Sequence, residues 1–167
     1  MKKQKSLQSG QTLLEILLAF SVSVLVLSAI VIGVTGSLNN ANYTKNQNLA
    51  NSYAQEGMAV VRQIRDSSWE NFFNMTDAKN YCLPSSNILA ANFSPDCITT
   101  GDGKVGIFER SVVIYHDSDD CPNKKMPGTQ VTVKVAWSDS KCSTENLYCH
   151  NVKLISCFSN IDEREEP

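Results

Sequence analysis

The sequence contains one long apolar run, LLEILLAFSVSVLVLSAIVIGV, at residues 13–34. Glu15 is the single charged residue in this run, and its other polar residues are serines. At about 1.5 Å per residue, a helix over these 22 residues would be roughly 33 Å long, enough to cross the hydrocarbon core of a bilayer. We therefore predict a transmembrane helix near the N-terminus.

The charges beside the run predict how this helix is oriented. Lys2, Lys3 and Lys5 precede it, whereas the next charged residue after it is Lys45. Because positively charged flanks stay on the cytoplasmic side, the N-terminus should be cytoplasmic and the larger C-terminal part should lie outside.

All six cysteines lie in that outer part, which is the side where oxidation occurs. An even number of cysteines in an oxidising compartment favours disulfides. Buried reduced thiols or a zinc site are the alternatives, but no pair has CxxC spacing. We therefore predict disulfide bonds among Cys82, Cys97, Cys121, Cys142, Cys149 and Cys157.

Composition limits the classes of function. A chain of 167 residues with 42% hydrophobic residues suits a single domain. Its net charge of −2 argues against nucleic-acid binding, which requires a basic face. The sequence has no glycine-rich phosphate loop, no metalloprotease helix motif and no Ser-His-Asp grouping, so we expect neither an enzyme nor a cofactor. The run from His116 to Asp120 could hold a cation, but we favour a solvated turn and expect no metal site.

The start of the apolar run admits more than one interpretation. A secretory signal peptide would have a shorter apolar region with its cleavage site after it, whereas the obvious junction here, Ser9-Gly10, comes before the run. An uncleaved anchor fits the length but gives no reason for Glu15 other than helix capping. Thr12 and Glu15 do match a capping box, and a carboxylate in the first turn meets the positive end of the helix dipole.

Residues 9–15, SGQTLLE, together with the apolar helix that follows, resemble the cleavage and methylation site of type IV prepilins. The resemblance implies that a dedicated membrane peptidase cuts after Gly10 and that Gln11, the new first residue, is methylated. It also implies that Glu15 pairs with the N-terminal amine of a neighbouring subunit during assembly. Loss of the leader would leave 12 basic and 17 acidic residues, a net charge of −5.

The same resemblance implies a domain order and a set of partners. Residues 1–10 would be the leader, residues 11–38 the transmembrane and filament-core half of the helix, and residues 39–167 the outer domain. The partners would be other pilin or pseudopilin subunits, the prepilin peptidase and methyltransferase, and membrane lipid before assembly. The precursor would sit in the inner membrane with its C-terminal domain outside, and the mature subunit in a pilus or pseudopilus.

The motif fits major pilins, minor pilins and pseudopilins alike. Gln11 stands where the family most often has phenylalanine, and this feature together with the cysteine-rich outer domain favours a minor subunit. The alternative is an uncleaved single-pass protein with an extracellular binding or sensor domain, in which Glu15 is only a helix cap.

For the outer part we predict an α+β fold. An amphipathic stripe should continue the helix to about Trp69 and pack on a sheet of three or four antiparallel strands. The strands are expected at 105–116, 129–138 and 147–158, after an irregular loop at 81–103. The stripe consists of Ala50, Tyr53, Ala54, Gly57, Val61, Ile64, Ser68 and Phe72.

Hydrophobic alternation suggests a register for the last two strands. Pairing Trp137 with Leu154, and Val133 with Phe158, keeps the apolar residues on one face. The same register brings Cys142 opposite Cys149, so we predict that bridge. Six cysteines permit many connectivities, and among these we also select Cys82 with Cys97 and Cys121 with Cys157.

Overall fold

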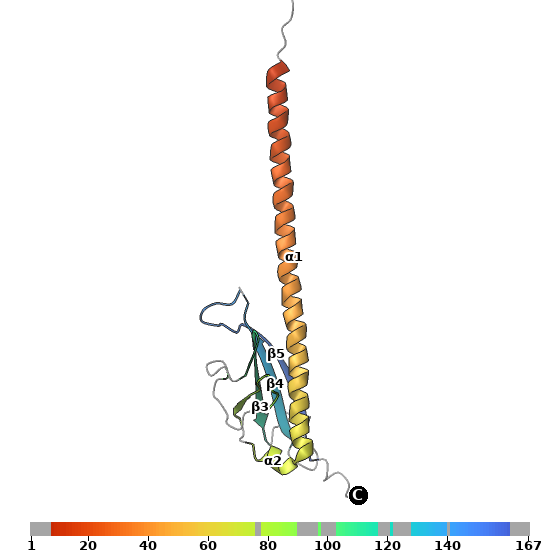
Figure 1. Cartoon of the computed structure of the whole chain (residues 1–167), viewed down its shortest axis with the longest axis vertical. Helices are drawn as coiled ribbons and strands as arrows, with labels where there is room; N and C mark the ends of the chain where they lie inside the picture. Colours follow the sequence, from red (N-terminus) through yellow and green to blue (C-terminus); the bar gives the residue numbers. More distant parts are fainter. Residues whose placement is uncertain are drawn as a thin grey trace, which may run out of the picture. The chain divides into compact units, whose positions relative to one another are not determined.

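The computed structural model describes residues 8–75, 78–89, 97, 103–116, 121, 128–139 and 141–160, with side chains from residue 12 onward. It contains a long N-terminal helix and a small antiparallel sheet (Figure 1), which confirms the predicted pilin-like α+β fold. Along the chain the elements are α1 (Gln8–Ser67), α2 (Trp69–Phe73), β1 (Asn80–Cys82), β2 (Lys104–Val105), β3 (Phe108–Tyr115), β4 (Thr129–Trp137) and β5 (His150–Phe158).

The chain divides into two compact units, Met1–Thr44 and Lys45–Pro167. The division falls within α1, slightly beyond the boundary at residues 38 and 39 that the sequence suggested. In the first unit, the described residues all belong to α1. The second unit contains the rest of α1 and all the other elements.

In the second unit, the later part of α1 runs along one face of the sheet formed by β3, β4 and β5 (Figure 1). Its buried residues include Ala50, Ala54, Met58 and Val61, which recur at three- and four-residue steps. The predicted stripe is therefore correct, with Met58 as an addition. A Cβ atom built on Gly57 would lie 2.9 Å from side-chain atoms of both Leu83 and Val133, so glycine permits the close approach of helix and sheet.

The end of α1 is close to the predicted position. The helix stops at Ser67, and Ser68 takes an extended backbone with φ −165° and ψ 112°. The Ser68 hydroxyl then accepts a hydrogen bond of 3.2 Å from the Asn71 amide, which caps α2. This second short helix buries Phe72 in the core.

The strands pair antiparallel in the order β1-β3-β4-β5, and β2 also pairs with β3. In β4 the alternate residues Val131, Val133, Val135 and Trp137 are all buried and form the centre of the core. Phe158 on β5 contacts Phe72, with ring centroids 5.8 Å apart. The predicted inward face of β4 is thus confirmed.

The predicted register of β4 and β5 is wrong by four residues. In the structure Trp137 pairs with His150, and Val133 pairs with Leu154. A shift by an even number of residues leaves every side chain on its original face, so hydrophobic alternation alone could not distinguish the two registers.

Three predicted boundaries also need correction. Tyr81 and Cys82, assigned to a loop, belong to β1 and pair with β3. The strand expected to start at Val105 is instead a small hairpin of β2 and β3, with Gly106 in the turn at φ +60°, a conformation that favours glycine. The last strand begins at His150 rather than at Leu147. Within the described residues the sheet therefore has five strands, and two of them are too short to give a periodic signal.

Candidate functional site

The apolar run predicted to cross a membrane is helical and exposed. Every large apolar side chain at residues 13–34 lies in α1 and is between 45% and 72% exposed. Among the described helices, α1 alone is long and apolar enough to span a bilayer. An apolar surface of this extent is unfavourable in water and requires lipid or protein to cover it.

The serines in this run are already hydrogen-bonded within the helix. Ser21, Ser23 and Ser28 each donate a hydrogen bond of 2.8 Å to a backbone carbonyl three or four residues earlier. This bonding lowers the cost of placing hydroxyl groups in an apolar medium. Glu15 differs, because it is the only charged side chain of the run.

The predicted cleavage site lies at the start of α1. The helix begins at Gln8, so Gly10 and Gln11 are in its first turn, although the side chain of Gln11 is not among those described. Thr12 is inside the helix and is not its N-cap in the full-length chain, in contrast to the capping expected from the sequence. In a chain that starts at Gln11, Thr12 and Glu15 would again lie in the first turn.

The structure pairs the six cysteines as the sequence analysis selected. The pairs are Cys82 with Cys97, Cys121 with Cys157, and Cys142 with Cys149, with Cα atoms 5.4 to 5.5 Å apart. The third pair forms although its predicted strand register is wrong, because the residues after Trp137 turn back and bring the two cysteines together. These Cα separations lie in the range usual for disulfides.

A buried arginine, which the sequence analysis missed, connects three segments of the second unit. Arg110 on β3 donates from Nε to the Leu83 carbonyl at 3.1 Å and from Nη2 to Asn87 Oδ1 at 3.0 Å. Its Nη2 also donates to the Pro84 carbonyl, and its Nη1 lies 3.4 Å from Glu56 Oε2 on α1. Burial lowers the pKa of the Arg110 guanidinium, and the negative charge of Glu56 opposes that change.

Asp139 and His150 meet at the end of the β4–β5 hairpin. His150 Nε2 lies 3.0 Å from Asp139 Oδ2, and the Lys141 amide donates a 2.8 Å hydrogen bond to Asp139 Oδ1. The hydrogen bond from Lys141 is the main cause of the lowered pKa of Asp139, and His150 adds to it. This pair borders the Cys142–Cys149 bridge, and its contact was not predicted from the sequence.

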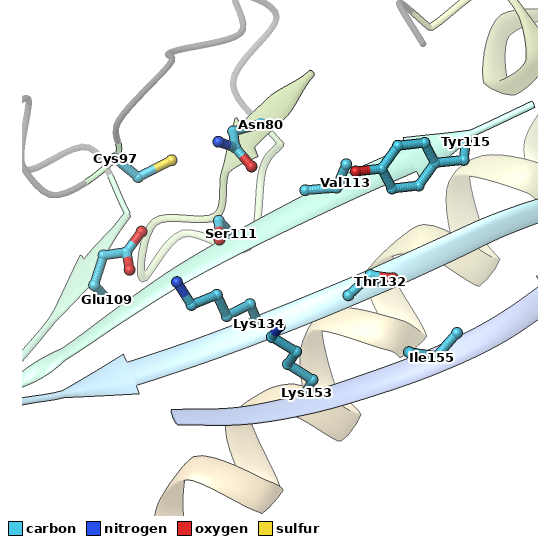
Figure 2. Close-up of a pocket in the computed structure, with 10 residues that line it drawn as sticks. All are labelled: Asn80, Cys97, Glu109, Ser111, Val113, Tyr115, Thr132, Lys134, Lys153 and Ile155. Carbon is cyan, nitrogen blue, oxygen red and sulfur yellow. The ribbon is translucent and has the colours of Figure 1, made fainter. Parts of the chain in front are cut away.

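A groove of about 400 Å³ lies on the open face of the sheet, away from the face that buries Val133 (Figure 2). Lys134 and Lys153 line it as directly opposed residues of β4 and β5, and Figure 2 shows them beside Glu109 and Ser111. Two ammonium groups opposed across a ladder repel each other, and the Glu109 carboxylate that lines the same groove offsets part of their positive charge.

His116, one of the two histidines, serves the fold. Its ring nitrogens lie 2.9 Å from the Met75 carbonyl oxygen and 3.2 Å from Thr129 Oγ1, and its ring packs on Phe73. Residues 117–120, which with His116 formed the candidate cation loop, lie outside the described residues.

No protein-family model, curated protein or solved structure matches this chain.

Proposed function

We propose that this chain is a structural subunit of a type IV pilus or a related pseudopilus, made as a membrane-inserted precursor and cleaved after Gly10. The proposal rests on the exposure and the hydrogen bonding of residues 13–34. They form an exposed apolar helix whose serines are bonded internally, which leaves Glu15 as the one charge that needs a partner.

Assembly through this helix satisfies both requirements. Packing against equivalent helices of other subunits would cover the apolar side chains, which move from lipid to protein. Cleavage frees a positively charged amine on Gln11, and a neighbouring subunit can place Glu15 beside it. The two charges, each costly in an apolar medium, then neutralise one another and fix the register of assembly.

The second unit fits an extracytoplasmic role. Its sheet is covered on one face by α1, and its loops are tied by three disulfides, which persist in oxidising compartments. Before assembly the precursor would lie in the inner membrane with this unit outside, and after assembly on the filament. Gln11 and the cysteine-rich unit favour a minor subunit.

The groove that contains Lys134 and Lys153 supports a second candidate function. An uncleaved, membrane-anchored protein could use this face to bind an acidic ligand outside the cell. In that case Glu15 would not pair with a partner amine, and the N-terminal leader would remain on the functional protein.

The N-terminus of the mature protein distinguishes the two functions. Protein purified from its native membrane is expected to start at Gln11 and to carry a methylated amine, as measured by intact mass and N-terminal peptide analysis. A functional chain that retains Met1, or that starts beyond residue 20, would reject the prepilin proposal. As a matched test, Gly10→Leu should accumulate as full-length precursor in the membrane, whereas Ser9→Ala should be processed normally.

A further inference from the structure

Four side chains with metal-binding atoms converge at the end of the β4–β5 hairpin. They are Asp139, Cys142, Cys149 and His150, and their ligand atoms all lie within 4.8 Å of one another. All four residues are half-buried, so water and small ions can reach them while neighbouring protein holds them in place.

Contacts other than the disulfide also hold two of these residues in place. His150 is the first residue of β5 and pairs with Trp137 in the last rung of the ladder, where the two rings stack with centroids 5.4 Å apart. Asp139 accepts the Lys141 amide hydrogen bond, and the Cys142 amide donates to the Asp139 carbonyl at 3.2 Å. The turn therefore has its own hydrogen bonds.

The donor set matches one class of metal ion. Two thiolates, one imidazole nitrogen and one carboxylate oxygen are ligands that Zn²⁺ takes in tetrahedral sites. Zn–S bonds of about 2.3 Å separate two sulfurs by roughly 3.8 Å in a tetrahedron. The two sulfurs are bonded to each other in the disulfide, so they must move apart within the turn after reduction. The disulfide cannot supply these two ligands, because the thiolate is the form of cysteine that binds metals.

We propose that Asp139, Cys142, Cys149 and His150 form a tetrahedral zinc-class site when the Cys142–Cys149 bridge is reduced. The hairpin end would then be closed either by a disulfide or by a metal ion. Reduction by a dithiol breaks the S–S bond: the dithiol gives up two electrons and two protons and becomes a disulfide, and the cysteines gain them as thiols. Binding of Zn²⁺ releases both thiol protons to solvent.

The test uses the full-length protein in detergent micelles, reduced with dithiothreitol and desalted without oxygen. Co²⁺ is the probe, because tetrahedral thiolate coordination gives strong visible and near-ultraviolet absorption. The reduced chain is expected to bind one equivalent of Co²⁺, which Zn²⁺ then displaces, and the oxidised chain is expected to bind none. Equal absorption from the oxidised chain would overturn the proposal.

Alkylation identifies the cysteines that bind the metal ion. Zn²⁺ should protect Cys142 and Cys149 of the reduced chain from iodoacetamide, whereas the exposed Cys157 should react with or without the metal. Protection of Cys157 in place of the proposed pair would contradict the site.

Variants of the same strand complete the test. His150→Ala should lose the Co²⁺ absorption, His150→Cys should restore it through a third thiolate, and the exposed neighbour Asn151→Ala should bind as the parent does. Far-ultraviolet circular dichroism checks folding. If reduction unfolds the chain, one equivalent of Zn²⁺ should restore the spectrum of the parent but not that of His150→Ala, and failure to do so would reject the site.

Discussion

Arg110 Nη1 on β3 lies 3.4 Å from Glu56 Oε2 on α1, and the two side chains differ sharply in exposure, at 1% and 41%. The guanidinium gives its other hydrogen bonds to the carbonyls of Leu83 and Pro84 and to Asn87. One buried cation thus joins the helix, the sheet and the segment after β1.

Removal of this cation should destabilise the second unit severely. We expect Arg110→Ala to lower the free energy of unfolding by about 3 kcal/mol or more, because buried carbonyls and a carboxylate lose their donor. Glu56→Gln should cost only about 1 kcal/mol, since the carboxylate is half-exposed to solvent. Urea unfolding followed by tryptophan fluorescence in detergent measures both changes.

The pair of the partly buried Arg65 and the exposed Asp66 provides the control for this comparison. Asp66→Asn should change the free energy of unfolding by no more than about 0.5 kcal/mol. A loss from Asp66→Asn as large as that from Arg110→Ala would show that burial of the guanidinium is not the cause.

Gly57→Ala should also destabilise the packing of α1 on the sheet. Its new Cβ atom would meet Leu83 Cδ2 and Val133 Cγ1 at 2.9 Å, so the helix must move away or the side chains must shift. We expect a net loss of roughly 1 to 3 kcal/mol in the free energy of unfolding, because overpacking outweighs the better helix propensity of alanine. Gly36→Ala, whose Cβ meets nothing within 4 Å, should cause no loss in the same unfolding experiment.

The disulfides should differ in their contributions according to loop length. The Cys121–Cys157 bridge spans 36 residues and the Cys142–Cys149 bridge spans 7. In the chain-entropy description these loops correspond to about 4 and about 2 kcal/mol. Double Cys→Ser variants of each pair should show this order in urea unfolding, and the reverse order would mean that strain or denatured-state structure dominates.

Glu15→Val should separate membrane insertion from assembly. The substitution makes the helix more apolar, so the precursor should insert and be cut after Gly10 as before. The proposed function predicts that incorporation into filaments falls by about tenfold or more, because the Gln11 amine of the neighbouring subunit would lose its proposed partner. Sheared filaments quantified by immunoblot measure this, with Leu17→Val as the control, and normal incorporation of Glu15→Val would refute the charge pairing.

Strong periodic signals made much of the fold predictable. The apolar run and the stripe from Ala50 to Ile64 gave α1, and the alternation of β4 gave its inward face because both patterns extend over several repeats. Of the disulfide pairs, Cys142–Cys149 was argued from a hairpin register that is wrong by four residues, and the other two pairs were selected among many connectivities. The pairing registers of the strands had no such signal, because shifting β5 by an even number of residues leaves the same side chains on the same face.

The polar sites were harder to predict from the sequence. Arg110 occupies an inward position of β3 between Phe108 and Val112, and a charge at such a position is itself a signal of a buried partner network. Two of its acceptors are the backbone carbonyls of Leu83 and Pro84, and a backbone carbonyl cannot be recognised as a partner from residue type. Likewise Asp139 reaches His150 only through a turn whose geometry the sequence does not specify.

All six cysteines follow α2, so no covalent crosslink ties α1 to the sheet. Tension applied through α1 would therefore be resisted by packing, by Gly57 in its close contact and by the Arg110–Glu56 pair. Once these contacts break, the disulfides still prevent the loops of 15 and 36 residues that they close from extending. At roughly 3.4 Å per residue, these two loops keep about 170 Å of chain from extending. A stretched subunit would therefore begin to unfold early and then stop far short of full extension.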